Sequence, residues 1–200
     1  MQYQAKILIG VAVMALIVVA VILFQNKAAS NNKQAAELLA KAIPLYEMSS
    51  YKEAIEGQAS TNTTGLKKIV DDYGSTENGE TAKIYLGNAY MMTGKTDDAF
   101  KAFDSYSGSN PLFKSTAMAA KAGILQQRNE NEKAADLYKD AAKISKTNPA
   151  NPEYLFEAGV ILLKLGKKEE AKSLFDTIKK DYKTSSQFSE ADRYLIQIEG

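Results

Sequence analysis

The sequence predicts an all-α protein in which one N-terminal transmembrane helix is followed by an α-solenoid of paired helices and a C-terminal capping helix. Three observations lead to this prediction. An uninterrupted apolar stretch lies near the N-terminus, apolar residues recur with helical spacing through the rest of the chain, and Gly and Pro punctuate these later stretches. Past residue 27 there is no alternating pattern of the kind that indicates strands.

The apolar stretch from Ile7 to Phe24 contains eighteen residues without a polar side chain. As a helix that rises about 1.5 Å per residue it is about 27 Å long, which is close to the hydrocarbon thickness of a bilayer. A buried helix of a soluble protein would normally carry a polar face. We therefore expect residues 1–27 to form a membrane anchor that spans the bilayer at residues 7–24, and residues 28–200 to form the repeat domain.

A cleaved secretory signal is the alternative interpretation of this stretch, because small residues at positions 28–30 offer a cleavage site. Signals typically have apolar regions of about 7 to 15 residues, so the length favours an uncleaved anchor. The charges leave the orientation open. Lys6 precedes the span, while Lys27, Lys33 and Lys41 follow it, so the positive-inside rule does not favour an external C-terminal domain.

Composition argues against several classes of function. The 25 Lys and Arg residues nearly balance the 24 Asp and Glu residues, so no basic field is available for a nucleic-acid backbone. The chain has no Cys and no His, and thus lacks thiolate chemistry, the usual general base near neutral pH and the commonest metal ligand. We expect no enzyme activity, no metal or other cofactor, no small-molecule substrate and no nucleic-acid partner.

Paired acids are the remaining candidates for catalysis, and they have a structural interpretation. Asp97 and Asp98, like Glu169 and Glu170, fall where a helix is expected to begin. Negative side chains in a first turn interact favourably with the helix dipole. We therefore assign no catalytic residue to these pairs.

The clearest repeat is the stretch LGNAYMMTGKTDDAFKAFDSYSGSNP. Gly87 and Tyr90 lie on its first expected helix, which ends at Gly94. Ala99 and Phe103 lie on the second helix. The small residues Gly87 and Ala99 allow the two helices to approach closely, and the ring of Phe103 fills the space beside them. This pattern resembles a tetratricopeptide repeat.

Two further copies follow at a spacing close to the repeat length of about 34 residues. A shift of 35 residues from Gly87 leads to Ala122, and a shift of 72 leads to Gly159, which is followed by Gly166 and Phe175. A weaker unit precedes these copies and contains the polar insertion GQASTNTTG, which we expect to be an exposed loop. The expected units cover residues 35–76, 80–111, 115–148 and 152–185, and a capping helix covers residues 187–199, with Ser189 as its candidate N-cap.

In tetratricopeptide stacks the first helix of each unit lines the concave side, which predicts an apolar, Met-rich surface suited to peptide segments. The predicted partner-binding residues are Ile84, Asn88, Met91, Met92, Gln126, Gln127, Phe156, Val160 and Leu163. Ile84 and Val160 are equally compatible with the core between repeats. Some adaptors of this family grip a terminal carboxylate with basic residues, but Glu153 and Glu157 occupy matching positions here, so we expect no such capture.

The arrangement of the whole chain resembles that of the YfgM-like family. It comprises a single span, a first hairpin with a polar insertion, the segment GLKKIVDDYGSTENGETAKIYLGNAY, and two further repeats with a closing helix. The resemblance implies a bacterial inner-membrane protein ancillary to the SecYEG translocon, with a cytoplasmic N-terminus and a periplasmic repeat domain. It also implies the Sec translocon and a PpiD-like chaperone as partners in handling exported proteins. The alternative is a structural subunit or assembly scaffold of another envelope membrane complex.

Overall fold

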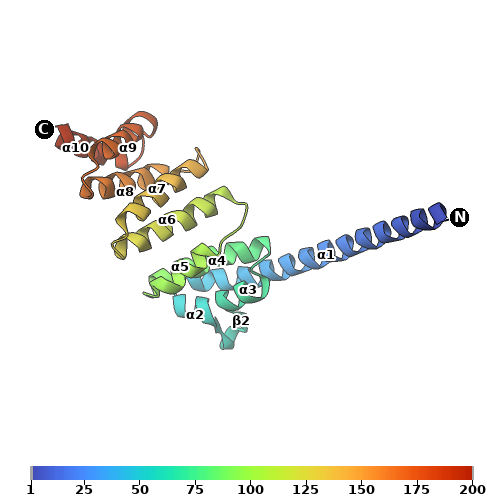
Figure 1. The fold of residues 1–200 in the computed structure, drawn as a ribbon. Coiled ribbons are helices and arrows are strands. Elements are labelled where there is room, and N and C mark those ends of the chain that lie inside the picture. Colours follow the sequence, from blue (N-terminus) through green and yellow to red (C-terminus); the bar gives the residue numbers. More distant parts are fainter. Residues whose placement is uncertain (1, 200) are drawn as a thin grey trace. The chain divides into compact units, whose positions relative to one another are not determined.

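The computed structural model describes residues 2–199, with side chains from residue 13 onward. It confirms the all-α class, with an apolar N-terminal helix and a series of helical hairpins closed by a last helix (Figure 1). The helices are α1 (Gln2–Glu47), α2 (Tyr51–Glu56), α3 (Leu66–Tyr73), α4 (Glu77–Met92), α5 (Thr96–Asp104), α6 (Pro111–Gln127), α7 (Asn131–Ile144), α8 (Asn151–Lys164), α9 (Lys168–Asp181) and α10 (Gln187–Glu199). The chain divides after Ala82 into two compact units, which are described separately.

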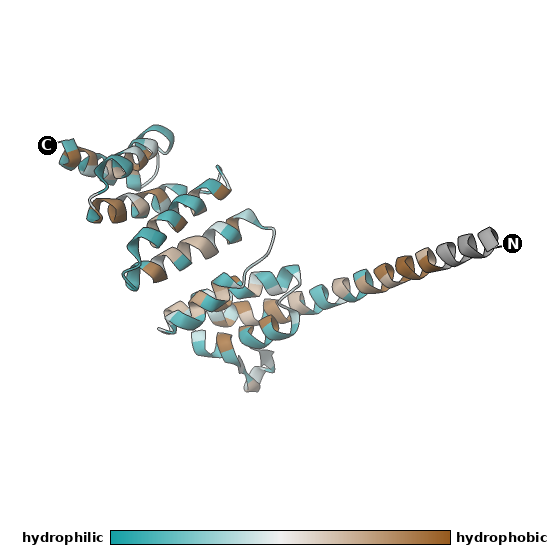
Figure 2. Ribbon diagram, in the orientation of Figure 1, coloured by the Kyte–Doolittle hydropathy of each residue, from teal (hydrophilic) through white to brown (hydrophobic). Residues whose placement is uncertain are grey.

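The first unit is built on α1, which continues without a break from the predicted anchor into the first repeat. Side chains from Val13 to Phe24 are exposed, and Phe24 shows 75% of its surface. The hydropathy colouring of the ribbon shows this part of α1 as mainly hydrophobic (Figure 2). Residues 7–12 of the predicted span have side chains outside the described part. Farther along, Ala35 and Leu39 are buried. One helix is therefore apolar and uncovered over a length that can cross a bilayer, and packed against protein beyond it.

Helices α2 and α3 complete the first unit by packing against the second half of α1, with Ile55, Leu66 and Ile69 buried. The polar insertion between them is more ordered than the predicted loop. Strand β1 (Gly57–Gln58) pairs antiparallel with β2 (Thr63–Thr64), and a short 3₁₀ turn joins the two. The Thr61 hydroxyl donates a hydrogen bond to the Gln58 side-chain oxygen, 2.8 Å away, which ties the turn together.

In the second unit, successive helices from α5 to α10 pack against one another. The predicted close approach inside the hairpins is confirmed. A Cβ atom added to Gly87 would lie 2.6 Å from the ring of Phe103, and one added to Gly159 would lie 2.7 Å from the ring of Phe175. Such separations are shorter than van der Waals contact, so only glycine allows these helices to pack as they do. Gly94 lies just after α4 with a positive φ of 74°.

The predicted helix-start features agree with the structure except for the cap of the last helix, whose predicted bounds of 187–199 match α10. The acid pairs occupy the first turns of α5 and α9, as expected. The candidate cap at Ser189 is wrong, because α10 begins at Gln187 and Ser189 lies inside it. Asp192, three residues after Ser189, forms an ion pair of 2.8 Å with Lys179 of α9. Asp192 therefore takes part in a contact between α10 and α9, and Ser189 does not cap a helix.

Candidate partner-binding surface

The predicted partner-binding residues of α4 separate into buried and accessible positions. Ile84 exposes only 4% of its surface and belongs to the core, which agrees with the second of its two interpretations. Met92 is 61% exposed at the end of the helix, while Asn88 and Met91 are partly buried. Three of the four residues therefore remain accessible to a partner.

On α6 and α8 the predicted residues lie at the surface of the second unit. Gln126 is partly buried, and Gln127 at the end of α6 is exposed. Val160 and Leu163 are partly buried side chains that pack against the core of this unit and leave one side open. These residues offer apolar area beside amide groups, which is a combination suited to a polypeptide segment.

Phe156 has a different environment from the open apolar position that the repeat pattern predicts. Its ring centroid lies 5.8 Å from that of Phe175 and 5.5 Å from that of Tyr194 on α10. The Phe175 and Tyr194 rings are themselves stacked at 5.2 Å. Phe156 is therefore largely engaged in an aromatic cluster that attaches the closing helix, and its residual surface is the part left for a partner.

Carboxylates near this apolar area are candidate binding groups that were not predicted from the sequence. Glu157 is partly buried on α8, and burial together with nearby Glu153 and Glu190 raises its pKa above the usual value. Within the described part of the chain, neither Glu153 nor Glu157 has an ion-pair partner. Glu153, Glu157 and Glu190 are called the acidic strip below.

The phenol of Tyr138 lies near Glu153 and Glu157 of the acidic strip. A Cβ atom on Gly123 of α6 would be only 3.3 Å from this hydroxyl, so the phenol of α7 reaches α6. Burial, with Glu157 and Glu153 nearby, raises the pKa of Tyr138 to about 12. The phenol therefore stays neutral at physiological pH and can donate a hydrogen bond beside negative carboxylates.

Among residues 13–199, no group of three or more carboxylate side chains is arranged to hold a metal ion. The half-buried, unpaired carboxylate of Glu157 beside Val160 and Leu163 is suited instead to a segment that carries both cationic and apolar side chains. Stacked helical hairpins that present such a surface define the class of protein-interaction modules.

Comparison with known families agrees with this class. Residues 153–185, which cover α9 and all but the first two residues of α8, match the model of the tetratricopeptide repeat. The chain therefore contains a tetratricopeptide repeat, and the acidic strip begins on its first helix. A comparison with curated proteins gives no match.

Proposed function

We propose that this protein is a membrane-anchored interaction module that binds segments of partner proteins on the accessible side of α6 and α8. One observation carries the proposal. The Glu157 carboxylate is partly buried without an ion-pair partner in the described chain, and Val160 and Leu163 follow it at three-residue intervals on the same helix. The positive charge of Lys164 acts on Glu157 without forming an ion pair with it. A bound Lys or Arg would supply a counter-charge in direct contact, and an adjacent apolar side chain would cover the neighbouring area.

The partner class follows from the anchor and from the resemblance to YfgM-like proteins. We propose that the anchor holds the repeats at the bacterial inner membrane, with the repeat domain in the periplasm. There the surface would assist the Sec translocon and a PpiD-like chaperone in handling exported chains. Segments with basic and apolar residues are accessible while such chains are still unfolded, which supports a role in handling them.

Site-specific photo-crosslinking from position 163 in native membranes tests this proposal. The crosslinker replaces Leu163, and the test variant Glu157→Gln removes one charge while it keeps the shape of the side chain. Because charge-assisted hydrogen bonds contribute about 1.5–3 kcal/mol, we expect about tenfold or greater loss of partner affinity. The matched control is Asp176→Asn, which removes one charge from an exposed position on α9.

The products distinguish the proposed roles. Crosslinks to the translocon or its chaperone, weakened by Glu157→Gln and unchanged by Asp176→Asn, support the proposal. Crosslinks to one envelope complex at a fixed ratio, without competition by exported chains, indicate a structural scaffold. If crosslinking from position 163 is no stronger than crosslinking from an exposed residue of α9, the proposed binding surface is wrong. A reporter fused after Gly200 tests the orientation separately, since a cytoplasmic signal contradicts the periplasmic assignment.

A further inference from the structure

The first unit is attached to α1 immediately beyond the apolar stretch of that helix. The side-chain oxygen of Asn32 accepts hydrogen bonds from the backbone N–H and from the side-chain amide of Asn78, both at 2.9 Å. Two residues later, the Gln34 oxygen accepts a hydrogen bond of 3.1 Å from the hydroxyl of Tyr73. These contacts join α1 to the end of α3 and the start of α4, so the turn between those helices is held beside α1.

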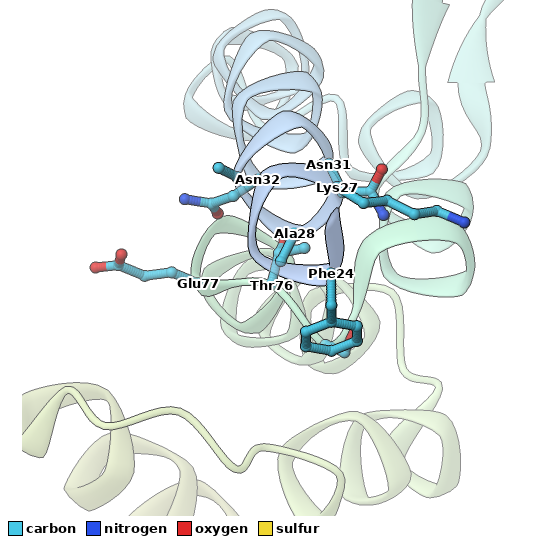
Figure 3. Close-up of a pocket in the computed structure, with 9 residues that line it drawn as sticks. Phe24, Lys27, Ala28, Asn31, Asn32, Thr76 and Glu77 are labelled. Atoms are coloured by element: carbon cyan, nitrogen blue, oxygen red, sulfur yellow. The ribbon is translucent and has the colours of Figure 1, made fainter. Parts of the chain in front are cut away.

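The turn between α3 and α4 and the end of the apolar stretch face the same pocket, which has a volume of about 590 Å³ (Figure 3). Phe24, Lys27 and Asn32 are among the residues that line the pocket from α1, and Ser75, Thr76 and Glu77 line it from the turn. Phe24 is the last residue of the predicted span and also one wall of the pocket. The turn therefore reaches back along α1 toward the level at which the apolar stretch ends.

The length of α1 places this pocket relative to a bilayer. From Phe24 to Asn32 a helix rises about 12 Å. Each headgroup layer is about 5–7 Å thick, which is half the difference between the full bilayer and its hydrocarbon core. With Phe24 at the edge of the hydrocarbon, the Phe24 side of the pocket lies within the headgroup layer and Asn32 lies about 5 Å beyond it. The turn at residues 75–77, which lines the pocket between these two residues, therefore lies at the outer side of the headgroup layer.

The turn itself is stiff, so it cannot simply move away from the surface. The Thr76 hydroxyl donates a hydrogen bond to the Tyr73 carbonyl at 2.8 Å and accepts one from the backbone N–H of Gly79 at 3.1 Å. Gly79 approaches α3 so closely that a Cβ atom there would lie 1.8 Å from the Tyr73 carbonyl oxygen. Movement of the turn would therefore require separation of α3 from α4.

We propose that the turn at residues 75–77 is a membrane-contact surface that rests against the outer side of the polar headgroup layer, held there by α1. This inference relies on the membrane anchor of the proposed function. Glu77 and the exposed Asp71 and Asp72 are acidic, and Lys27 is the one cation that lines the pocket. The turn therefore has no basic cluster that would attract anionic lipids. We expect the contact between the turn and the headgroups to be insensitive to lipid charge and to salt.

Fluorescence quenching in vesicles tests this contact on the full chain. The chain has no Cys, so Ser75→Cys allows a single fluorophore on an exposed side chain of the turn. Glu47→Cys is the matched control, because it lies on α1 itself about 35 Å farther along the axis than Phe24. The quencher is phosphatidylcholine with a nitroxide on its headgroup, in neutral vesicles and in vesicles that also contain phosphatidylglycerol.

We expect the label at position 75 to lose roughly half of its emission, and the label at position 47 to lose almost none, because only the turn lies close to the nitroxides of the headgroup layer. The loss should be equal in neutral and anionic vesicles. Equal emission at positions 75 and 47 would overturn the inference, as would quenching at position 75 only with anionic lipid. A Gly/Ser linker inserted after Ala29 should abolish the quenching, and persistence would show that α1 does not hold the turn.

Flotation of the same labelled protein with the vesicles tests the membrane anchor separately from the membrane-contact surface. If the protein floats and the label at position 75 is not quenched, the membrane-contact surface is wrong and the anchor stands. If the protein does not float, the anchor of the proposed function is wrong, and the contact surface is rejected with it.

Discussion

Replacement of Gly159 by alanine tests the close packing of α8 against α9. The new Cβ atom would lie 2.7 Å from two ring atoms of Phe175, about 0.8 Å short of the roughly 3.5 Å at which carbon atoms attract. Phe175 is completely buried, and its ring already contacts those of Phe156 and Tyr194. Little space is left into which the ring could retreat.

The expected loss of stability is the difference between two opposing effects. Overpacking of a well-packed core costs about 1–3 kcal/mol, and the blocked ring places this site in the upper part of that range. Alanine is more favourable than glycine inside a helix by about 1 kcal/mol. We therefore expect Gly159→Ala to reduce the free energy of unfolding by about 1–2 kcal/mol.

Urea unfolding of the full chain in a mild detergent, followed by far-UV circular dichroism, measures this change. Gly123→Ala on α6 is the matched control, because the nearest atom to its new Cβ would be the Tyr138 hydroxyl at 3.3 Å. This control should be neutral or more stable. In a double-mutant cycle, Phe175→Leu should recover about 1 kcal/mol of the loss at Gly159. Equal stability of the Gly159 and Gly123 variants would refute the packing argument.

Three further predictions concern other contacts. Gly79→Ala should destabilise the first unit by about 2–3 kcal/mol, because its Cβ would overlap the Tyr73 carbonyl; an unchanged thermal unfolding profile would contradict this. Asp192→Asn, which breaks the partly exposed pair with Lys179, should cost less than about 1 kcal/mol in urea unfolding, and a larger loss would show a stronger contact. The raised pKa of Tyr138, about 12, favours the neutral phenol in the folded state, so its contribution to stability is complete below the ordinary value of 10 and is lost as pH rises through about 12. Burial also raises the pKa of Tyr154, so ultraviolet titration should show late phenolate formation by both residues, and the latest step should disappear in Tyr138→Phe while that of Tyr154 remains.

The features that the sequence allowed us to predict depend on short-range spacing. Gly87 and Phe103 have the same separation as Gly159 and Phe175, and each pair meets across one hairpin in the structure. The ends of α4 and α8 were also predictable, because the turn after each has a positive φ that glycine adopts readily, at Gly94 (74°) and Gly166 (75°). Both signals arise within one repeat and need no knowledge of distant helices.

Features formed by residues far apart in the sequence could not be predicted in this way. Tyr194 of α10 contacts Phe156 of α8, but repeat spacing says nothing of which side chain a closing helix presents. The acidic strip was overlooked for a related reason, because the partial burial of Glu157 depends on neighbours from other elements. The pairing of β1 with β2 involves two residues in each strand, which is too few to show a periodicity.

The unbroken course of α1 has a consequence for how the protein responds to its lipid environment. An apolar stretch longer than the local hydrocarbon thickness adapts to a thinner bilayer by tilting. Because α1 has no break between Phe24 and the buried Ala35, the first unit turns through the same angle as the span. With the proposed anchor in a bilayer, the bilayer thickness would thereby set the orientation of this unit relative to the membrane plane.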